Sequence, residues 1–275
     1  MKDRSRTHIV VQSMLTNLRL AARKLLKSPG FTATALATLA LCIGANLAIF
    51  AVVDAILVRP LPFKDSGRLA TIFNSYPRAG KMRDGASLTS YYERRGQIPA
   101  FSKLAAVAFA SAVVGEAGSS QREDFGRVSP EFFDTLGVAP EMGRVFTEAE
   151  MTYQTDHEAI LTHEYWRDQF ASDPKILGKA IRTDGLSRTV VGVLPPGFHF
   201  LSAKARFFMP LSSEEGERNL GARHNGNTTQ IARLRDGATL AEAQAQIDAH
   251  NGAHAAEFPY AKEAATSLAY GNSSA

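Results

Sequence analysis

The sequence predicts an α+β protein: an amphipathic helix, one N-terminal transmembrane helix, and then a two-lobed mixed α/β domain. Three observations predict this class. Residues 31–53 carry no charged side chain, basic residues crowd into the first 30 positions, and the remainder alternates strand-like and helix-like segments. An uncharged apolar run of about 18 residues or more is long enough to cross a bilayer, so we expect a membrane-anchored chain.

Residues 1–30 form the predicted cytoplasmic segment. One side of a helical wheel is apolar, and the other carries the basic face Arg19, Arg23, Lys24 and Lys27. Such a helix lies in the membrane surface. It serves either as a plain anchor or as an elbow against a cytoplasmic partner, and Ser28-Pro29-Gly30 ends it. The sequence pI near 9.2 derives from this short segment, which favours anionic membrane lipid over nucleic acid as its partner.

The predicted membrane span runs from Phe31 to Val58. Its 28 residues would reach roughly 42 Å as a helix, more than the roughly 30 Å hydrocarbon layer. Small and polar residues inside a span often mark a helix–helix contact, which makes Gly44 and Asn46 candidates for one. The alternative is that such side chains bond only to their own helix. Asp54, the first charge after Phe31, is expected at the outer interface, where its carboxylate reaches water.

The flanking charges predict the orientation. Residues 1–30 hold seven basic residues and one acidic residue, whereas the whole chain has a formal net charge of only +4. Basic residues concentrate on the cytoplasmic side of a span. We therefore expect a bacterial inner-membrane protein, single-pass, with a cytoplasmic N-terminus and a periplasmic C-terminal domain. A cleaved signal peptide is the rival interpretation, but its apolar core is only about 7–15 residues long. Cys42, the sole cysteine, lies inside the span and permits no intrachain disulfide.

After the span, Arg59-Pro60-Leu61-Pro62 ends the helix, and mixed strands and short helices follow. Ser87 is expected to cap a helix, and Asp184-Gly185 is a strong hairpin signal. Capping residues also precede the other predicted helices. The predicted strands are 68–73, 101–114, 125–128, 158–161, 180–183, 188–193 and 229–234. The predicted helices are 87–95, 131–136, 162–170 and 239–258. This mixture with hairpins indicates an α/β or α+β domain.

The sequence offers little catalytic chemistry. Neither Gly80-Lys81 nor Gly178-Lys179 completes a phosphate-binding P-loop, so an ATPase would be another chain. The acidic pairs Glu123-Asp124 and Glu214-Glu215 are typical of solvated faces. His163-Glu164 lacks the second histidine of a zinc-protease motif. We therefore predict no enzyme, no catalytic residue and no cofactor.

His250 and His254 form a less ordinary pair, because they lie four positions apart on one face of the last predicted helix. Three interpretations of the pair compete. The two side chains are partly buried and hydrogen-bonded, they line a subunit contact, or they bind a metal. A third metal ligand is not evident in the sequence, so the first interpretation is preferred and the metal remains a weak candidate.

Several segments together carry a family resemblance. They are 25–31, 39–50, Val58-Arg59-Pro60-Leu61-Pro62, Val128-Ser129-Pro130-Glu131-Phe132-Phe133, 136–140, 178–181 and 190–198. In order and spacing they resemble the first membrane helix and periplasmic core domain of MacB-like and FtsX-type ABC transporter permeases. The resemblance covers roughly residues 14–265, and no single motif in it is diagnostic.

The resemblance implies a dimeric permease that works with a cytoplasmic ATP-binding subunit. It implies a periplasmic core over 59–268, with a porter-like lobe of about 63–128 plus 226–268, an inserted lobe of about 129–225, and a tail at 269–275. ATP-driven motion would cross the membrane for efflux or for lipoprotein or peptide handling. Three more membrane helices follow this domain in the family, whereas this sequence shows no second apolar span, so we expect a permease truncated before them. The alternatives are a membrane-tethered periplasmic binding or adaptor module that works without an ATPase and, less favoured, an anchored enzyme.

Overall fold

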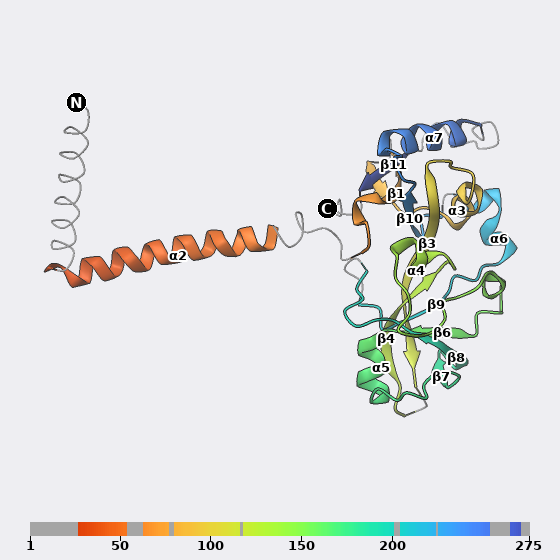
Figure 1. The fold of residues 1–275 in the computed structure, drawn as a ribbon, viewed down its shortest axis with the longest axis horizontal. Helices are drawn as coiled ribbons and strands as arrows, with labels where there is room; N and C mark the ends of the chain where they lie inside the picture. Colours follow the sequence, from red (N-terminus) through yellow and green to blue (C-terminus); the bar gives the residue numbers. More distant parts are fainter. Residues whose placement is uncertain are drawn as a thin grey trace, which may run out of the picture. The chain divides into compact units, whose positions relative to one another are not determined.

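The computed structural model describes residues 27–53, 63–76, 80–115, 118–200, 204–223, 225–253 and 265–270. Contacts within the chain divide it into two compact units, Met1–Arg59 and Pro60–Ala275. The first unit contains helix α2 (Pro29–Val53), and the second contains a folded α+β domain (Figure 1). The predicted fold class is therefore confirmed.

Helix α2 is the predicted apolar helix. It begins at Pro29, and a proline suits the first turn because its missing N–H would have no partner there. Within the described residues, Pro29–Phe50 is the one stretch whose length and composition would allow a membrane crossing, and none of it is buried. Its continuation to Val58 lies outside the described residues. So does the predicted amphipathic helix before Lys27.

The described part of the domain contains an 11-stranded mixed sheet. Its strands are β1 (Leu69–Tyr76), β2 (Lys81–Asp84), β3 (Phe101–Val114), β4 (Gln121–Val128), β5 (Met142–Gly143), β6 (Glu158–Leu161), β7 (Ala180–Thr183), β8 (Leu186–Val193), β9 (Phe207–Pro210), β10 (Thr229–Leu234) and β11 (Ala265–Tyr270). The order is β11-β1-β10-β3-β4-β9-β6-β8-β5, with β2 beside β1, and with β7 beside β3 and β8. The β4–β9 and β6–β8 pairs are parallel, and the other pairs are antiparallel.

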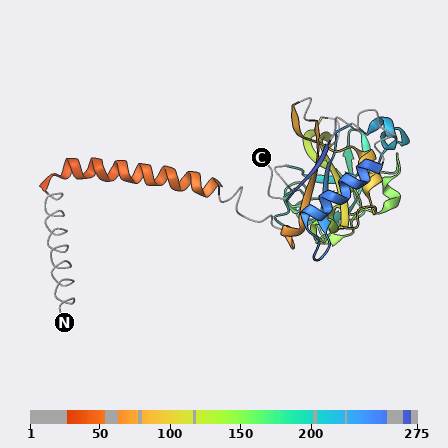
Figure 2. The ribbon, with the colours of Figure 1, turned by 90° about the horizontal axis from the view of Figure 1, so that it is seen from above.

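Helices accompany the sheet in the described part of the domain. They are α3 (Leu88–Arg94), α4 (Phe132–Leu136), α5 (His163–Phe170), α6 (Glu215–Arg218) and α7 (Leu240–Ala253), with 3₁₀ turns η2 (Ser66–Arg68), η4 (Glu148–Met151) and η5 (Leu220–Ala222). Among them, α6 packs against α3. Figure 2 shows α7 lying across the strands at one end of the domain, and Figure 1 places α5 at the other end. The Gln244 side chain ties α7 to β11, because it donates to the Thr266 carbonyl at 2.7 Å and accepts from the Leu268 N–H at 2.9 Å.

Most of the expected elements are present. The strands predicted at 101–114, 158–161, 180–183 and 229–234 have the predicted bounds, as β3, β6, β7 and β10. The Ser87 and Thr162 side chains accept from the N–H groups of Ser90 and Tyr165, as predicted for helix caps. The other strands and helices differ by a few residues at their ends, and the predicted end of the last helix beyond Ala253 lies outside the described residues. Strands β2, β5, β9 and β11 and helix α6 were not predicted.

Three hydrophobic cores hold the domain together, and β3 contributes to all of them. The central core contains Phe63, helix α4 and Phe208 of β9. The α7 core lies under α3 and α7, and the α5 core lies under α5. Strand β3 supplies Leu104 to the α7 core, Val107 to the central core and Ala112 to the α5 core. One strand of 14 residues therefore links both ends of the domain.

Candidate functional site

Helix α2 satisfies its polar side chains within itself. The hydroxyls of Thr34 and Thr38 each donate to the carbonyl four residues earlier at 2.9 Å. The amide of Asn46 likewise donates to the Cys42 carbonyl at 2.9 Å. Self-bonding of this kind lowers the cost of a polar group in lipid. A helix–helix contact at Gly44 and Asn46 stays a prediction.

The segment 63–65 holds the first described residues of the folded domain, and this segment, which we call the entry segment, is the candidate functional site. Phe63 is 8% exposed and belongs to the central core. Its ring centroid lies 6.1 Å from that of Phe198 and 6.1 Å from that of Phe200. Phe200 in turn packs edge-on against Phe132 of α4 at 5.1 Å. The entry segment is therefore anchored in the central core of the domain.

Arg233 of β10 fastens the entry segment by hydrogen bonds to backbone carbonyls. Its Nη2 donates to the Lys64 carbonyl at 2.8 Å, and its Nη1 lies 3.4 Å from the Asp65 carbonyl. Its Nε donates to the Thr135 carbonyl of α4 at 2.7 Å. One guanidinium thus joins three parts of the fold: the entry segment, α4 and the sheet. We call Phe63, Lys64, Asp65, Thr135 and Arg233 the joint.

The electrostatic setting of Arg233 shows how deeply the joint is embedded. The residue is 9% exposed. Burial, and then the neighbouring charge of Arg68, lower the pKa of Arg233. The bonds to carbonyl oxygens compensate a buried cation that has no carboxylate in hydrogen-bond contact among the described residues. Arg68 reinforces the same region, because its Nε and Nη2 donate to the Leu234 carbonyl at 3.0 and 2.6 Å.

A second set of contacts, which we call the latch, ties α3 to α4 and η4. Arg95 forms ion pairs with Glu131 and with Glu148, the latter at 2.5 Å. The Tyr91 hydroxyl donates to Glu131 Oε2 at 2.9 Å. Burial first, and the charge of Glu131 second, raise the pKa of Tyr91 far above its ordinary value. The hydrogen bond from Arg95 lowers the pKa of Glu148. The ion pair with Arg95 therefore favours the ionised form of the Glu148 carboxylate.

Other residues singled out in the sequence make local contacts within the domain. His163 Nδ1 lies 2.8 Å from Glu141 Oε2, and Glu164 accepts from the Gly197 N–H at 2.9 Å. Glu214 takes part in a capping box at the start of α6. Glu123 lines a pocket beside α5.

The histidine pair is only half described. His250 is half-buried on α7, the helix that buries Ala243 and Ile247, and His254 lies outside the described residues. No cluster of three or more metal-ligating side chains occurs among the residues that the structure describes. The roles considered for the pair stay predictions. Asp54, Val58, Arg19, Arg23 and Lys24 also lie outside the described residues, and Lys27 is exposed.

Sequence reasoning missed the joint and the latch. Arg233 sits in a short apolar strand, where both neighbours, Ala232 and Leu234, are buried. Charged side chains are almost never buried unless they are paired. An arginine inside a predicted buried strand was therefore an available signal. The hydrogen-bond partners of Arg233 could not be predicted, because they are backbone carbonyls that lie nearly 100 or more positions away in the sequence.

Comparisons with known proteins agree with this fold. The family described as MacB-like periplasmic core domain matches residues 32–250, from within α2 to within α7. A comparison with curated proteins gives no significant match.

Solved structures with a similar fold include a domain described as part of a permease protein from Porphyromonas gingivalis, with 16% identity and a TM-score of 0.58, covering 76% of this chain and 92% of that one. The periplasmic region of MacB from Actinobacillus actinomycetemcomitans matches at 14% identity and a TM-score of 0.53, covering 75% and 90%. The extracellular domain of the noncanonic ABC-type transporter YknZ from Gram-positive bacteria matches at 16% identity and a TM-score of 0.51, and the match covers 73% of this chain and 99% of that one.

At such identities the solved structures establish the fold alone, whereas the family match spans most of the chain. The apolar helix α2 adds a membrane anchor by length and composition. The chain belongs to the MacB-like periplasmic core domain family of ABC transporter permeases.

Proposed function

We propose that this chain is the N-terminal permease component of an ABC transporter, which transmits ATP-driven motion across the inner membrane to its periplasmic domain. The observation that carries the proposal is the joint. Arg233 binds the carbonyls of Lys64 and Asp65 on the entry segment and that of Thr135 on α4. A displacement of the entry segment would therefore reach α4 and the sheet directly.

The packing around the joint favours transmission over a loose tether. Phe63 is buried among the aromatic rings of the central core. Close-packed cores are bistable and shift as units, so they transmit strain. A domain that only needs to be held near a membrane has no use for an entry segment that is fixed both by the buried Phe63 ring and by hydrogen bonds to its backbone carbonyls. This contrast supports the permease over the adaptor module.

The strand order supports the two-lobed division that the family suggests. Strand β10 lies between β1 and β3, so the segment 226–268 joins 63–128 in one part of the sheet. We propose that these two segments form the porter-like lobe. The segment 129–225, which supplies β5 to β9 and α5, would form the inserted lobe, and 269–275 would be a tail.

We infer three kinds of partner from the family and the charges. A cytoplasmic ATP-binding subunit would dock on the side of the basic face, Arg19, Arg23, Lys24 and Lys27. The same face would meet anionic lipid headgroups. A second copy of the chain, or other permease helices, would pack on the membrane span at Gly44 and Asn46. The cargo would be an efflux substrate, a lipoprotein or a peptide.

Co-purification tests the central claim. The full chain is extracted from the membranes of its own host and examined for an associated subunit with a P-loop ATPase sequence. We expect such a subunit, and we expect Arg19, Arg23, Lys24 and Lys27 changed together to glutamine to reduce its recovery. The control changes two basic residues of the periplasmic domain, Lys175 and Lys179, to glutamine. If no ATP-binding subunit is recovered, the adaptor module replaces the permease.

Orientation is tested with single cysteines, because Cys42 is the one native cysteine. In a Cys42→Ala background, Ser187→Cys lies on an exposed position of β8, and Ser5→Cys lies in the N-terminal segment. We expect a membrane-impermeant maleimide added to spheroplasts to label the first and spare the second. The opposite labelling pattern would reverse the proposed topology.

A further inference from the structure

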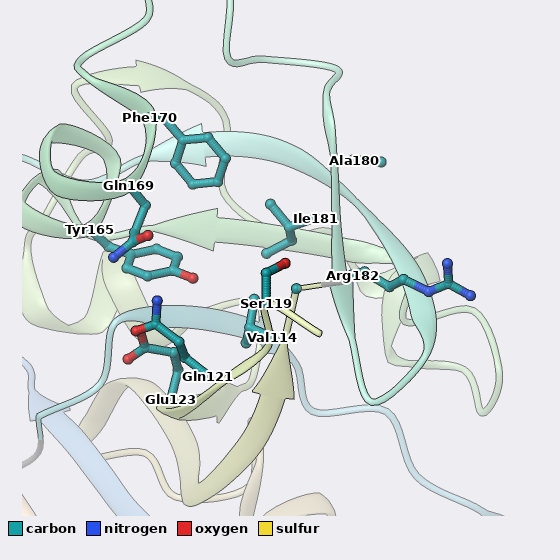
Figure 3. A pocket seen from close by; sticks show the side chains of 11 residues that line it. Val114, Ser119, Gln121, Glu123, Tyr165, Gln169, Phe170, Ala180, Ile181 and Arg182 are labelled. Carbon is teal, nitrogen blue, oxygen red and sulfur yellow. The ribbon is translucent and has the colours of Figure 1, made fainter. Parts of the chain in front are cut away.

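A pocket at the α5 end of the domain combines apolar walls with polar side chains. It lies between the end of the β3–β4 hairpin, α5 and β7, and its volume is about 270 Å³. Phe170 and Ile181 form apolar walls, and Figure 3 shows the polar side chains turned toward the same space. These polar side chains are Ser119, Gln121, Glu123, Tyr165 and Gln169.

Tyr165 is a built-in polar group at the base of this pocket. The residue is 3% exposed, and its ring packs against Phe170 and Phe207, with both centroid distances at 6.0 Å. Its hydroxyl has no hydrogen-bond partner among the described residues and points into the pocket in Figure 3. Burial, with Glu123 as the second cause, raises the pKa of Tyr165 to about 12. The hydroxyl is therefore neutral at physiological pH and can both donate and accept.

Glu123 supplies the negative charge. Its side chain is 15% exposed, and Arg206 Nε lies 3.8 Å from its Oε2, which is too far for a hydrogen bond. The Arg206 guanidinium lies 5.0 Å from the centre of the Tyr165 ring and also reaches Asp168 at 3.4 Å. Arg206 is thus shared between two carboxylates. Glu123 Oε1 makes no hydrogen bond to a described residue, so it remains available to a ligand.

The other basic residue at the pocket does not compete for this carboxylate. Arg182 lines the rim, but its guanidinium points away from the pocket in Figure 3, and its Nε donates to the Gly185 carbonyl at 3.2 Å. The two glutamine side chains, Gln121 and Gln169, make no hydrogen bonds to described residues. The pocket lining therefore contains one carboxylate, the hydroxyls of Tyr165 and Ser119, and two amides beside an aromatic wall.

We propose that this pocket binds small organic cations: an ammonium or amidinium group held by Glu123 and the Tyr165 hydroxyl, with its apolar body against Phe170 and Ile181. A half-buried carboxylate beside aromatic surface recognises a cation and its attached hydrocarbon together. The volume limits the ligand to a fragment of about the size of one substituted ring. This inference does not rest on the proposed transport function, because the pocket uses none of the residues of the joint.

Three nearly isosteric probes test the charge preference on the unmodified protein. The full chain is placed in nanodiscs of zwitterionic lipid, which avoids cation binding by anionic headgroups. Benzamidine, benzamide and benzoate are then titrated separately and followed by ligand-observed saturation-transfer NMR. We expect benzamidine to bind at least about ten-fold more tightly than benzamide, and benzoate not to bind. Equal affinity for benzamide, or tighter binding of benzoate, would overturn the proposal.

Two variants locate the binding. Glu123→Gln keeps the shape and removes the charge, and we expect it to weaken benzamidine binding by roughly ten-fold or more. Tyr165→Phe keeps the ring contacts and removes the hydroxyl, with an expected loss of roughly three- to ten-fold. Glu215→Gln, on exposed α6, is the matched control and should bind as the unmodified chain does. Unchanged binding in Glu123→Gln, or an equal loss in Glu215→Gln, would exclude this pocket as the site.

Discussion

Replacing Arg233 with methionine is expected to destabilise the folded domain by about 2–4 kcal/mol. The change removes two short hydrogen bonds, to the Thr135 carbonyl at 2.7 Å and the Lys64 carbonyl at 2.8 Å. Hydrogen bonds from a charged donor contribute about 1.5–3 kcal/mol each, and the change removes this donor from the carbonyl oxygen of the buried residue Thr135. Part of this loss is recovered, because the guanidinium itself is costly to bury.

The assay uses the single tryptophan of the chain. Trp166 belongs to the α5 core and donates from Nε1 to the Asp173 carbonyl at 3.0 Å, so its fluorescence reports the end of the domain away from α7. Thermal unfolding of the full chain in detergent is followed by this fluorescence and by far-ultraviolet circular dichroism. For a domain of this size, each kcal/mol shifts Tm by about 2–4 °C. We therefore expect Tm to fall by about 4–16 °C in both signals.

Arg235→Met is the matched control. Arg235 is exposed and donates from Nε to the Phe101 carbonyl at 3.1 Å, so the same substitution two positions away should cost about 0–1 kcal/mol. Equal Tm values for the two variants would refute the role assigned to Arg233. A lower Tm by circular dichroism with an unchanged Tm by Trp166 fluorescence would refute a separate inference, namely that strand β3 makes both ends of the domain unfold together.

Three further results are expected. Glu148→Gln should lower Tm at pH 7, because Arg95 lowers the pKa of this carboxyl in the folded state. The difference should shrink as the pH falls below the unfolded-state pKa of about 4.3 and vanish once the pH is below the lowered folded-state pKa of Glu148, whereas Glu215→Gln should show no such pH dependence. Gly143→Ala should be more destabilising than Gly178→Ala. Both glycines have a positive φ, but a Cβ atom at position 143 would lie 2.1 Å from a backbone oxygen, whereas a Cβ atom at position 178 would meet nothing within 4 Å. Equal losses of Tm in the two variants would contradict this. The chain should also stay in the membrane pellet after alkaline carbonate extraction, and recovery in the soluble fraction would contradict the membrane anchor.

Local signals in the sequence were sufficient for the elements that they define. Strand β3 has its predicted bounds because a β-prone apolar run marks it, and the β7–β8 hairpin follows from a turn at Asp184-Gly185 with both residues at positive φ. Strand β9 was missed because it is four residues long, fully buried and ends in Pro210, so it shows neither alternation nor length. Strand β5 has only two residues and exists through its pairing with β8.

The candidate site was less predictable than the fold for a physical reason. A cap or turn acts over two to four positions, so sequence spacing reveals it. The bonds of the joint connect Arg233 to Thr135 and Lys64 across long sequence separations. The polar residues of the pocket likewise come from β4 and α5, and the sequence alone suggested only that Glu123 lies on a solvated face. Tertiary contacts of this kind leave a trace only as a charged or polar residue in an otherwise buried segment.

The joint and the pocket lie beside opposite ends of strand β3, which makes the two proposals separable. Lys103 of β3 pairs with Arg233 in the sheet, and Val114 of β3 lines the pocket. Eleven positions of extended strand span roughly 36 Å. A substitution at Glu123 therefore leaves the hydrogen bonds of Arg233 untouched, and a substitution at Arg233 leaves the pocket side chains in place as long as the sheet remains folded. Because sites this far apart with no shared partners act additively, failure of one experiment carries no weight against the other.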